Sequence, residues 1–104
     1  MDTLERLVNT IASRRAADPE VSYVAKLNAK GVPKIAQKLG EEATETVIAA
    51  LSGSEADLVG ESADLLFHLL VLLDAKGIAL ADVMAELDRR EGVSGLDEKA
   101  SRSE

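Results

Sequence analysis

The sequence predicts an all-α protein, a small bundle of four or five helices. Apolar residues recur at helical spacing along most of the chain, and no stretch alternates long enough to indicate a strand. Aromatic residues make up only 2% of the chain, which favours aliphatic packing between helices over a β-sandwich. A length of 104 residues predicts one domain, residues 1–104, of a size at which oligomerisation helps to complete the core.

Composition excludes several classes of partner and site. The net charge of −7 makes nucleic acid and anionic membranes poor partners. The N-terminus lacks the basic start and apolar run of a signal peptide, and the longest apolar run, residues 65–73, is far shorter than the ~20 residues of a membrane span. The absence of cysteine excludes disulfides and thiolate metal sites. These features are compatible with a cytoplasmic protein in a reducing environment.

The first and last helices have recognisable ends. Asp2 or Thr3 can cap a first helix, which is expected to end before Pro19 because the residue that precedes a proline avoids the helical region. A last helix follows residues 78–82 and ends at Gly92. Its inward face is expected to consist of Val83, Met84 and Leu87.

A short basic helix is predicted between these ends. Ser22 can cap it and Gly31 can end it. Lys26 and Lys30 are four residues apart and therefore share one side. The alternative is a solvated loop with two ordinary lysines.

A third helix is predicted from the first turn at Pro33 to about Ser52 or Gly53. At ~100° per residue, its apolar and charged residues divide into two sides. The apolar side consists of Ile35, Ala36, Leu39, Ala43, Val47, Ala50 and Leu51. The opposite side consists of Lys34, Lys38, Glu41, Glu42, Glu45 and Ala49, and so contains the whole EExxE motif of residues 41–45.

A fourth helix is predicted from a cap at Ser54 to Gly77. Residues 58–73 are apolar nearly all round, which predicts a buried helix. One polar stripe interrupts it, formed by Asp57, Glu61, Asp64 and His68. Because such a helix needs cover on nearly every side, we expect a homodimer or a higher homo-oligomer to complete the bundle.

Two carboxylate pairs on these helices indicate a metal site. The short connection over residues 52–54 predicts antiparallel packing. Glu42 and Glu45 are three residues apart, as are Glu61 and Asp64, so each pair points to one side. Hard oxygen ligands suit Mg²⁺, or Mn²⁺, better than zinc. Since Mg²⁺ commonly binds carboxylates together with substrate phosphates, the cluster predicts metal-assisted phosphate chemistry.

Other interpretations of these residues remain open at this point. The EExxE motif is also typical of a solvated helix face whose glutamates pair with Lys34 and Lys38. His68 is more typical of a hydrogen-bonded packing residue than of a ligand. A di-iron site is disfavoured because the chain has no Glu-x-x-His motif, and the phosphate-binding loops of nucleotide-binding folds are absent.

EExxE followed at this distance by ExxD resembles the all-α nucleoside triphosphate pyrophosphatase superfamily, which includes MazG proteins and dimeric dUTPases. More of the chain resembles the phosphoribosyl-ATP pyrophosphatase family of histidine biosynthesis. The likeness extends over about residues 3–102 and includes the segments SYVAKLNAKG, KIAQKLGEEATETVIAAL, ESADLLFHLLVLL, LDRREG and SGLDEKASR.

This resemblance implies a MazG-like helical homodimer that hydrolyses the α–β phosphoanhydride of phosphoribosyl-ATP with Mg²⁺, giving phosphoribosyl-AMP and pyrophosphate. It implies metal binding by Glu42, Glu45, Glu61 and Asp64. It makes Glu41 a candidate to orient or deprotonate the attacking water. It also implies phosphate or ribose-phosphate contacts from Lys26, Lys30, Lys38, Lys99 and Arg102.

The C-terminal residues 93–104 allow two expectations. Their composition indicates a flexible terminus, whereas the resemblance implies a basic flap that orders over the substrate.

Two other functions stay open on the sequence. A housecleaning nucleoside triphosphate pyrophosphatase of the same superfamily has the same carboxylates and differs in substrate. A non-catalytic acidic helical module that binds protein partners predicts no Mg²⁺ binding and no release of pyrophosphate.

Overall fold

The computed structural model describes residues 2–92, Gly95 and Lys99. This part of the chain contains no strand, so the predicted all-α class is confirmed. Its five helices are α1 (Thr3–Arg14), α2 (Tyr23–Lys30), α3 (Val32–Ser52), α4 (Glu55–Ala75) and α5 (Leu80–Arg90). The expected flap falls almost entirely outside the described residues, and so does Arg102.

The helix boundaries follow from local capping. The side chains of Asp2, Ser22 and Ser54 each accept a hydrogen bond from a backbone N–H in the first turn of α1, α2 and α4. Gly31 ends α2 and Gly77 follows α4, with φ of +93° and +70°, which suit glycine because it has no Cβ. The predicted starts of these helices and the predicted ends of α2 and α4 are confirmed, whereas α1 ends at Arg14, earlier than the predicted end near Asp18 and Pro19.

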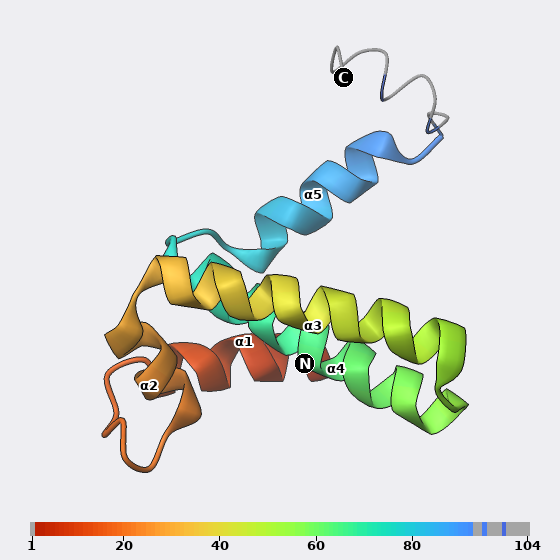
Figure 1. Ribbon diagram of the computed structural model, residues 1–104. Coiled ribbons are helices and arrows are strands. Elements are labelled where there is room, and N and C mark those ends of the chain that lie inside the picture. The colour runs from red at the N-terminus through yellow and green to blue at the C-terminus, as the bar shows by residue number, and fades with distance from the viewer. Residues whose placement is uncertain (1, 93–94, 96–98, 100–104) are drawn as a thin grey trace.

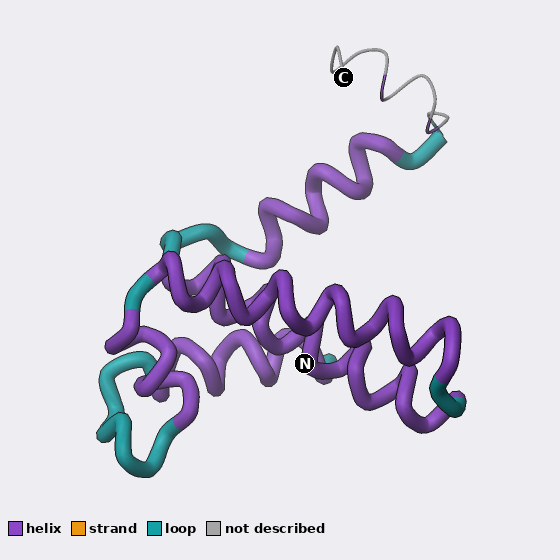
Figure 2. The backbone as a smooth tube through the Cα atoms, viewed as in Figure 1, coloured by secondary structure: helices purple, strands orange, loops and turns teal. Residues whose placement is uncertain are grey.

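The molecule is built on the antiparallel pair of α3 and α4, which are joined by a tight turn (Figures 1 and 2). The shorter α1 and α2 pack against the far end of this pair, away from the turn. The core lies there, among Ile11, Val24, Leu27, Ile35, Leu70 and Val71. An ion pair of 2.6 Å between Arg15 and Asp74 ties the end of α1 to the end of α4. Burial is therefore concentrated at one end of the helix pair.

The predicted burial of α4 on all sides is wrong for its first half. Val59 on α4 is 70% exposed and Leu51 on α3 is 82% exposed. The side of α3 that is buried contains Glu42 and Ala49, which the sequence places on its polar side. Since α1 and α2 cover only the far end of the pair, the side chains of Leu51 and Val59 near the turn are left exposed in the part of the chain that the structure describes.

Helix α5 leaves the bundle and projects away from the other helices (Figure 1). Leu80 at its start packs against the core. The predicted inward position of Met84 and Leu87 is wrong, because both are exposed, Leu87 by 54%. The sequence pattern was correct in giving α5 an apolar side, but within the described residues Met84 and Leu87 on that side are left exposed.

Within the part of the chain that the structure describes, every helix falls short of the length and apolarity that a membrane crossing requires.

The cap at the start of α4 should make a measurable contribution to stability. Ser54 and Asp57 form a capping box, with Asp57 N–H donating to Ser54 Oγ over 3.1 Å and Ser54 N–H donating to Asp57 Oδ2 over 3.0 Å. Ser54→Ala should lower the free energy of unfolding by about 1 kcal/mol in urea titrations. Ser52→Ala is the matched control, because the Ser52 hydroxyl donates only to the Ile48 carbonyl within its own helix. Equal losses in the two variants would contradict this role of the cap.

Candidate metal centre

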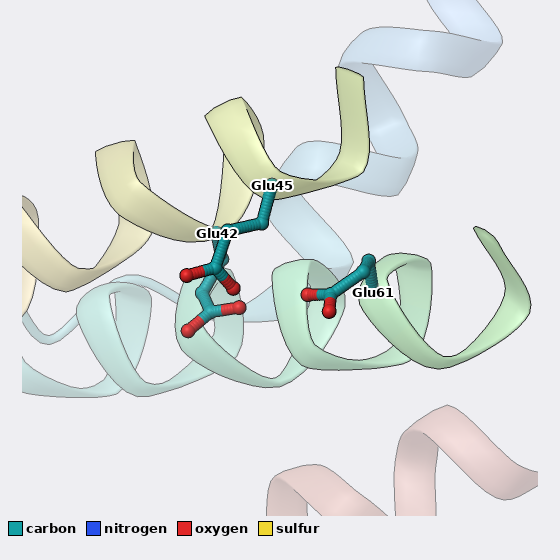
Figure 3. Close-up of side chains that lie close together, drawn as sticks. All are labelled: Glu42, Glu45 and Glu61. Carbon is teal, nitrogen blue, oxygen red and sulfur yellow. The ribbon is translucent and has the colours of Figure 1, made fainter. Parts of the chain in front are cut away.

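Three glutamates from the two long helices meet between them. Glu42 and Glu45 reach from α3 toward α4, which carries Glu61 (Figure 3). One carboxylate oxygen of each lies within 4.8 Å of the others. The cluster borders a cavity of about 250 Å³ whose lining includes Glu45, Glu61 and Asp57. The predicted meeting of the EExxE and ExxD motifs is confirmed for these three residues.

Thr46 fixes the two helices at the level of this cluster. Its hydroxyl oxygen lies 2.8 Å from the carbonyl oxygen of Glu42 in its own helix and 3.2 Å from that of Glu61 on α4. The hydroxyl is therefore shared between the backbones that carry two of the three glutamates. Sequence reasoning missed this residue, although a threonine inside a helix commonly bonds the carbonyl four residues before it.

The cluster has an excess of negative charge. Glu42 is only 8% exposed, and burial raises its pKa, helped by the charge of Glu45 and a hydrogen bond with it. Burial also raises the pKa of Glu61, together with its hydrogen bond to Glu45 and the neighbouring carboxylate charges. Oε2 of Glu42 and Oε2 of Glu61 are buried and have no hydrogen-bond partner. Such oxygens are costly to bury unless a cation or a donor compensates them.

Asp64 lies one turn beyond Glu61 and outside the set of three. Its side chain is exposed, and its charge contributes to the raised pKa of both Glu42 and Glu61. It is therefore close enough to act on the cluster electrostatically, while its carboxylate does not join the oxygens that meet there.

Glu41 is exposed and engaged elsewhere. It accepts a hydrogen bond of 3.1 Å from Gln37 and forms an ion pair of 3.1 Å with Lys38. The hydrogen bond from Gln37, followed by the hydrogen bond and charge of Lys38, lowers the pKa of Glu41. The alternative of a solvated face thus describes Glu41, whereas Glu42 of the same motif is buried.

Among the described residues, the predicted basic side chains form no ion pair with Glu42, Glu45 or Glu61. Lys26 and Lys30 lie on α2 and are exposed, and neither forms an ion pair with a described residue. Lys38 is partly exposed and paired with Glu41. Lys99 is exposed, and Arg102 is outside the described residues.

His68 is buried and takes no part in the carboxylate cluster. Its Nδ1 lies 2.7 Å from the carbonyl oxygen of Asp64, and its Nε2 lies 3.0 Å from the hydroxyl of Tyr23. The prediction of a hydrogen-bonded packing residue is confirmed. The donors that remain at the centre are all carboxylate oxygens, so this acidic cluster can hold a hard divalent cation.

Fold and site together define an all-α protein with a carboxylate centre suited to a divalent cation. The sequence matches the Phosphoribosyl-ATP pyrophosphohydrolase family over residues 4–91. Three similar proteins bear the name phosphoribosyl-ATP pyrophosphatase. That of Erythrobacter litoralis is 71% identical over the full length of both chains. That of Rhizorhabdus wittichii is 69% identical over 96% of this chain and 94% of its own. That of Novosphingobium aromaticivorans is 68% identical over 98% and 95%, respectively. The chain belongs to the phosphoribosyl-ATP pyrophosphohydrolase family.

The raised pKa of Glu61 predicts that its ionised carboxylate lowers the stability of the folded protein when a chelator has removed metal ions, and that this effect depends on pH. Between the ordinary glutamate pKa of 4.5 and the raised value, the folded state binds the proton more tightly than the unfolded state, so stability falls as pH rises through this window. Glu61→Gln should therefore be more stable than the unsubstituted protein at about pH 7.5, and the advantage should shrink toward about pH 5. Urea unfolding at both pH values, at one protein concentration, measures this difference.

Glu41→Gln is the matched control for this titration. The lowered pKa of Glu41 means that its contribution is present above the ordinary value of 4.5 and is lost only as pH falls below it. Its effect on stability should therefore be nearly the same at the two pH values. A Glu61→Gln variant that is less stable at the higher pH would show that Glu61 has a compensating partner.

Proposed function

We propose that this protein hydrolyses the α–β phosphoanhydride of phosphoribosyl-ATP, giving phosphoribosyl-AMP and pyrophosphate, in the cytoplasm and as a step of histidine biosynthesis. The observation that supports this most is a cluster of three glutamates, of which Glu42 is buried, in a chain that belongs to the phosphoribosyl-ATP pyrophosphohydrolase family. The assignment of phosphoribosyl-ATP as the substrate follows the names of the similar proteins. Residues 1–104 are proposed to form one catalytic domain.

The cation is proposed to be Mg²⁺, with Mn²⁺ as a substitute, held by Glu42, Glu45, Glu61 and Asp64. The two buried carboxylate oxygens without a hydrogen-bond partner fit this assignment, because a hard cation satisfies such acceptors. When bound, the cation polarises a phosphoryl oxygen and neutralises charge on the pyrophosphate that leaves. In proteins, Mg²⁺ commonly keeps several waters and binds through carboxylates together with substrate phosphates.

The residues of the chain then bind and orient the reactants. Water attacks a phosphorus atom of the α–β anhydride, the bridging P–O bond breaks, and the water loses a proton to a base. Glu41 is the proposed residue that orients or deprotonates this water, and to do so it has to exchange its ion pair with Lys38. This exchange frees the ammonium group of Lys38 to contact a phosphate of the substrate. The other proposed contacts to phosphate or ribose phosphate come from Lys26, Lys30, Lys99 and Arg102.

The apolar surface near the α3–α4 turn is proposed to be covered by a second copy of the chain. Its exposed members are Val47, Ile48, Leu51, Val59 and Leu66. They lie on the two helices that carry the carboxylates, so a dimer of this kind would also bring a second chain close to the site. A symmetric association covers the same residues on both copies at once.

The metal assignment predicts loss of activity when a ligand is removed. Glu45→Ala and Asp64→Ala should each lower kcat/KM for phosphoribosyl-ATP about a hundredfold or more, because a bound cation contributes several kcal/mol to catalysis. Pyrophosphate release, measured with Mg²⁺ and with chelator, tests this. Glu55→Ala is the control, since Glu55 is exposed in the first turn of α4 and belongs to no cluster.

The same assay, run over a panel of substrates, tests the substrate assignment. A preference for ordinary nucleoside triphosphates over phosphoribosyl-ATP would favour the housecleaning function. The absence of Mg²⁺-dependent release from every nucleotide would refute an enzymatic role.

The dimer proposal predicts a particle of two chains at micromolar concentration. Val47→Glu should convert it to a monomer in light scattering, because a charge within a buried apolar interface is costly. Val21→Glu is the matched control, since Val21 is equally apolar, is exposed and lies in the loop before α2. A monomeric unsubstituted protein would contradict the proposal.

A further inference from the structure

A hydrogen-bonded pair includes His68, which lies one turn beyond Asp64 on α4. The hydroxyl of Tyr23, the first residue of α2, lies 3.0 Å from Nε2 of His68. Nδ1 of His68 lies 2.7 Å from the carbonyl oxygen of Asp64. His68 is buried, whereas Tyr23 remains 46% exposed, with its ring stacked on Phe67 at 6.0 Å. A buried imidazole therefore holds an exposed phenol beside the proposed metal centre.

The partners of His68 decide which way these hydrogen bonds run. A carbonyl oxygen only accepts, so Nδ1 donates its proton to Asp64. In a neutral imidazole the other nitrogen is then an acceptor, and the Tyr23 hydroxyl donates to it. This uses the single proton of the phenol. Toward solvent, the Tyr23 oxygen can only accept a hydrogen bond.

The position of this oxygen relates it to the carboxylate site. His68 is seven residues after Glu61, which places it about 10 Å further along α4. Lys38 of α3 lies close by: its pKa is raised chiefly by its hydrogen bond and charge interaction with Glu41 and additionally by Tyr23. Tyr23 therefore lies within electrostatic reach of Lys38, which belongs to the helix that carries Glu42 and Glu45.

We propose that Tyr23 binds the nucleoside half of the substrate by accepting a hydrogen bond from it, and that His68 is the positioning residue that commits Tyr23 to this role. The matching group is a neutral donor, either a ribose hydroxyl or the purine amino group. A fully ionised phosphate oxygen has no proton to donate, so the phosphate end of the molecule gains nothing at Tyr23. The pair therefore fixes the direction in which the nucleotide lies. This inference rests on the proposed function, because it takes the phosphates to lie at the carboxylates.

The experiment measures binding without turnover. Tyr23 is the single tyrosine and the chain has no tryptophan, so tyrosine emission reports this residue alone. AMP should change that emission, and pyrophosphate with Mg²⁺ should leave it nearly unchanged. Tyr23→Phe should weaken AMP binding in calorimetry about three- to tenfold, the scale of one neutral hydrogen bond, and leave the affinity for pyrophosphate with Mg²⁺ unaltered.

Variants of His68 separate positioning from a general effect on the fold. His68→Leu should weaken AMP binding as Tyr23→Phe does, and His68→Gln should restore much of it because its amide oxygen can accept from the phenol. The affinity for Mn²⁺, measured in the absence of nucleotide, should be the same in all variants. This control tests whether the carboxylate cluster is intact. Ribose 5-phosphate identifies the donor: a response like that of AMP assigns it to the ribose, and no response assigns it to the purine.

Three results would overturn the inference. These are an emission that AMP does not change, equal losses of AMP and pyrophosphate affinity in Tyr23→Phe, and a parallel loss of Mn²⁺ affinity in the His68 variants. Because no step of this test requires hydrolysis, a protein that binds AMP through Tyr23 but does not cleave phosphoribosyl-ATP would refute the proposed function and leave this inference standing.

Discussion

Mutual repulsion among three glutamates, held between α3 and α4, is the constraint to which the rest of the molecule is fitted. The antiparallel packing of the two helices brings Glu42, Glu45 and Glu61 together, and no lysine or arginine of the described chain pairs with any of them. Packing thus creates a site whose negative charge exceeds what the chain itself compensates. Cation binding and folding are linked at such a site, because a ligand that binds only the folded state stabilises it.

The long helix pair is divided along its length into parts with different roles. At one end, α1 and α2 supply the apolar cover for Ile35 and Val71, and the Arg15–Asp74 ion pair ties α1 in place. The carboxylates occupy the middle. Toward the turn, the large apolar side chains of Val47, Leu51 and Val59 are exposed. The stable end therefore holds the two helices in register for a site that lies beyond the core.

Helix ends and the motif glutamates were predictable because their causes are local. Ser22, Ser54 and Gly31 act on backbone groups within one turn, and a spacing of three residues places Glu42 and Glu45 on one side whatever surrounds them. Burial was less predictable. The apolar pattern of α4 predicts a helix covered on all sides, but a pattern does not say which chain provides the cover, and Val59 is exposed. Leu87 on α5 is exposed as well, and here too the sequence pattern did not say which chain covers an apolar side. The hydrogen bond between Tyr23 and His68 joins residues 45 apart in sequence, so only the tertiary fold could reveal it.

The bridge made by Thr46 has a consequence for the space between the helices. Glutamate side chains are long and can adjust their reach, but the distance between the two backbones at this level is set by one short hydroxyl side chain with few rotamers. Discrimination between small and large divalent ions depends on how far a site can expand. The residue that bridges the two helices beside the cluster is thus a neutral one, and its hydroxyl is not among the carboxylate oxygens that meet there.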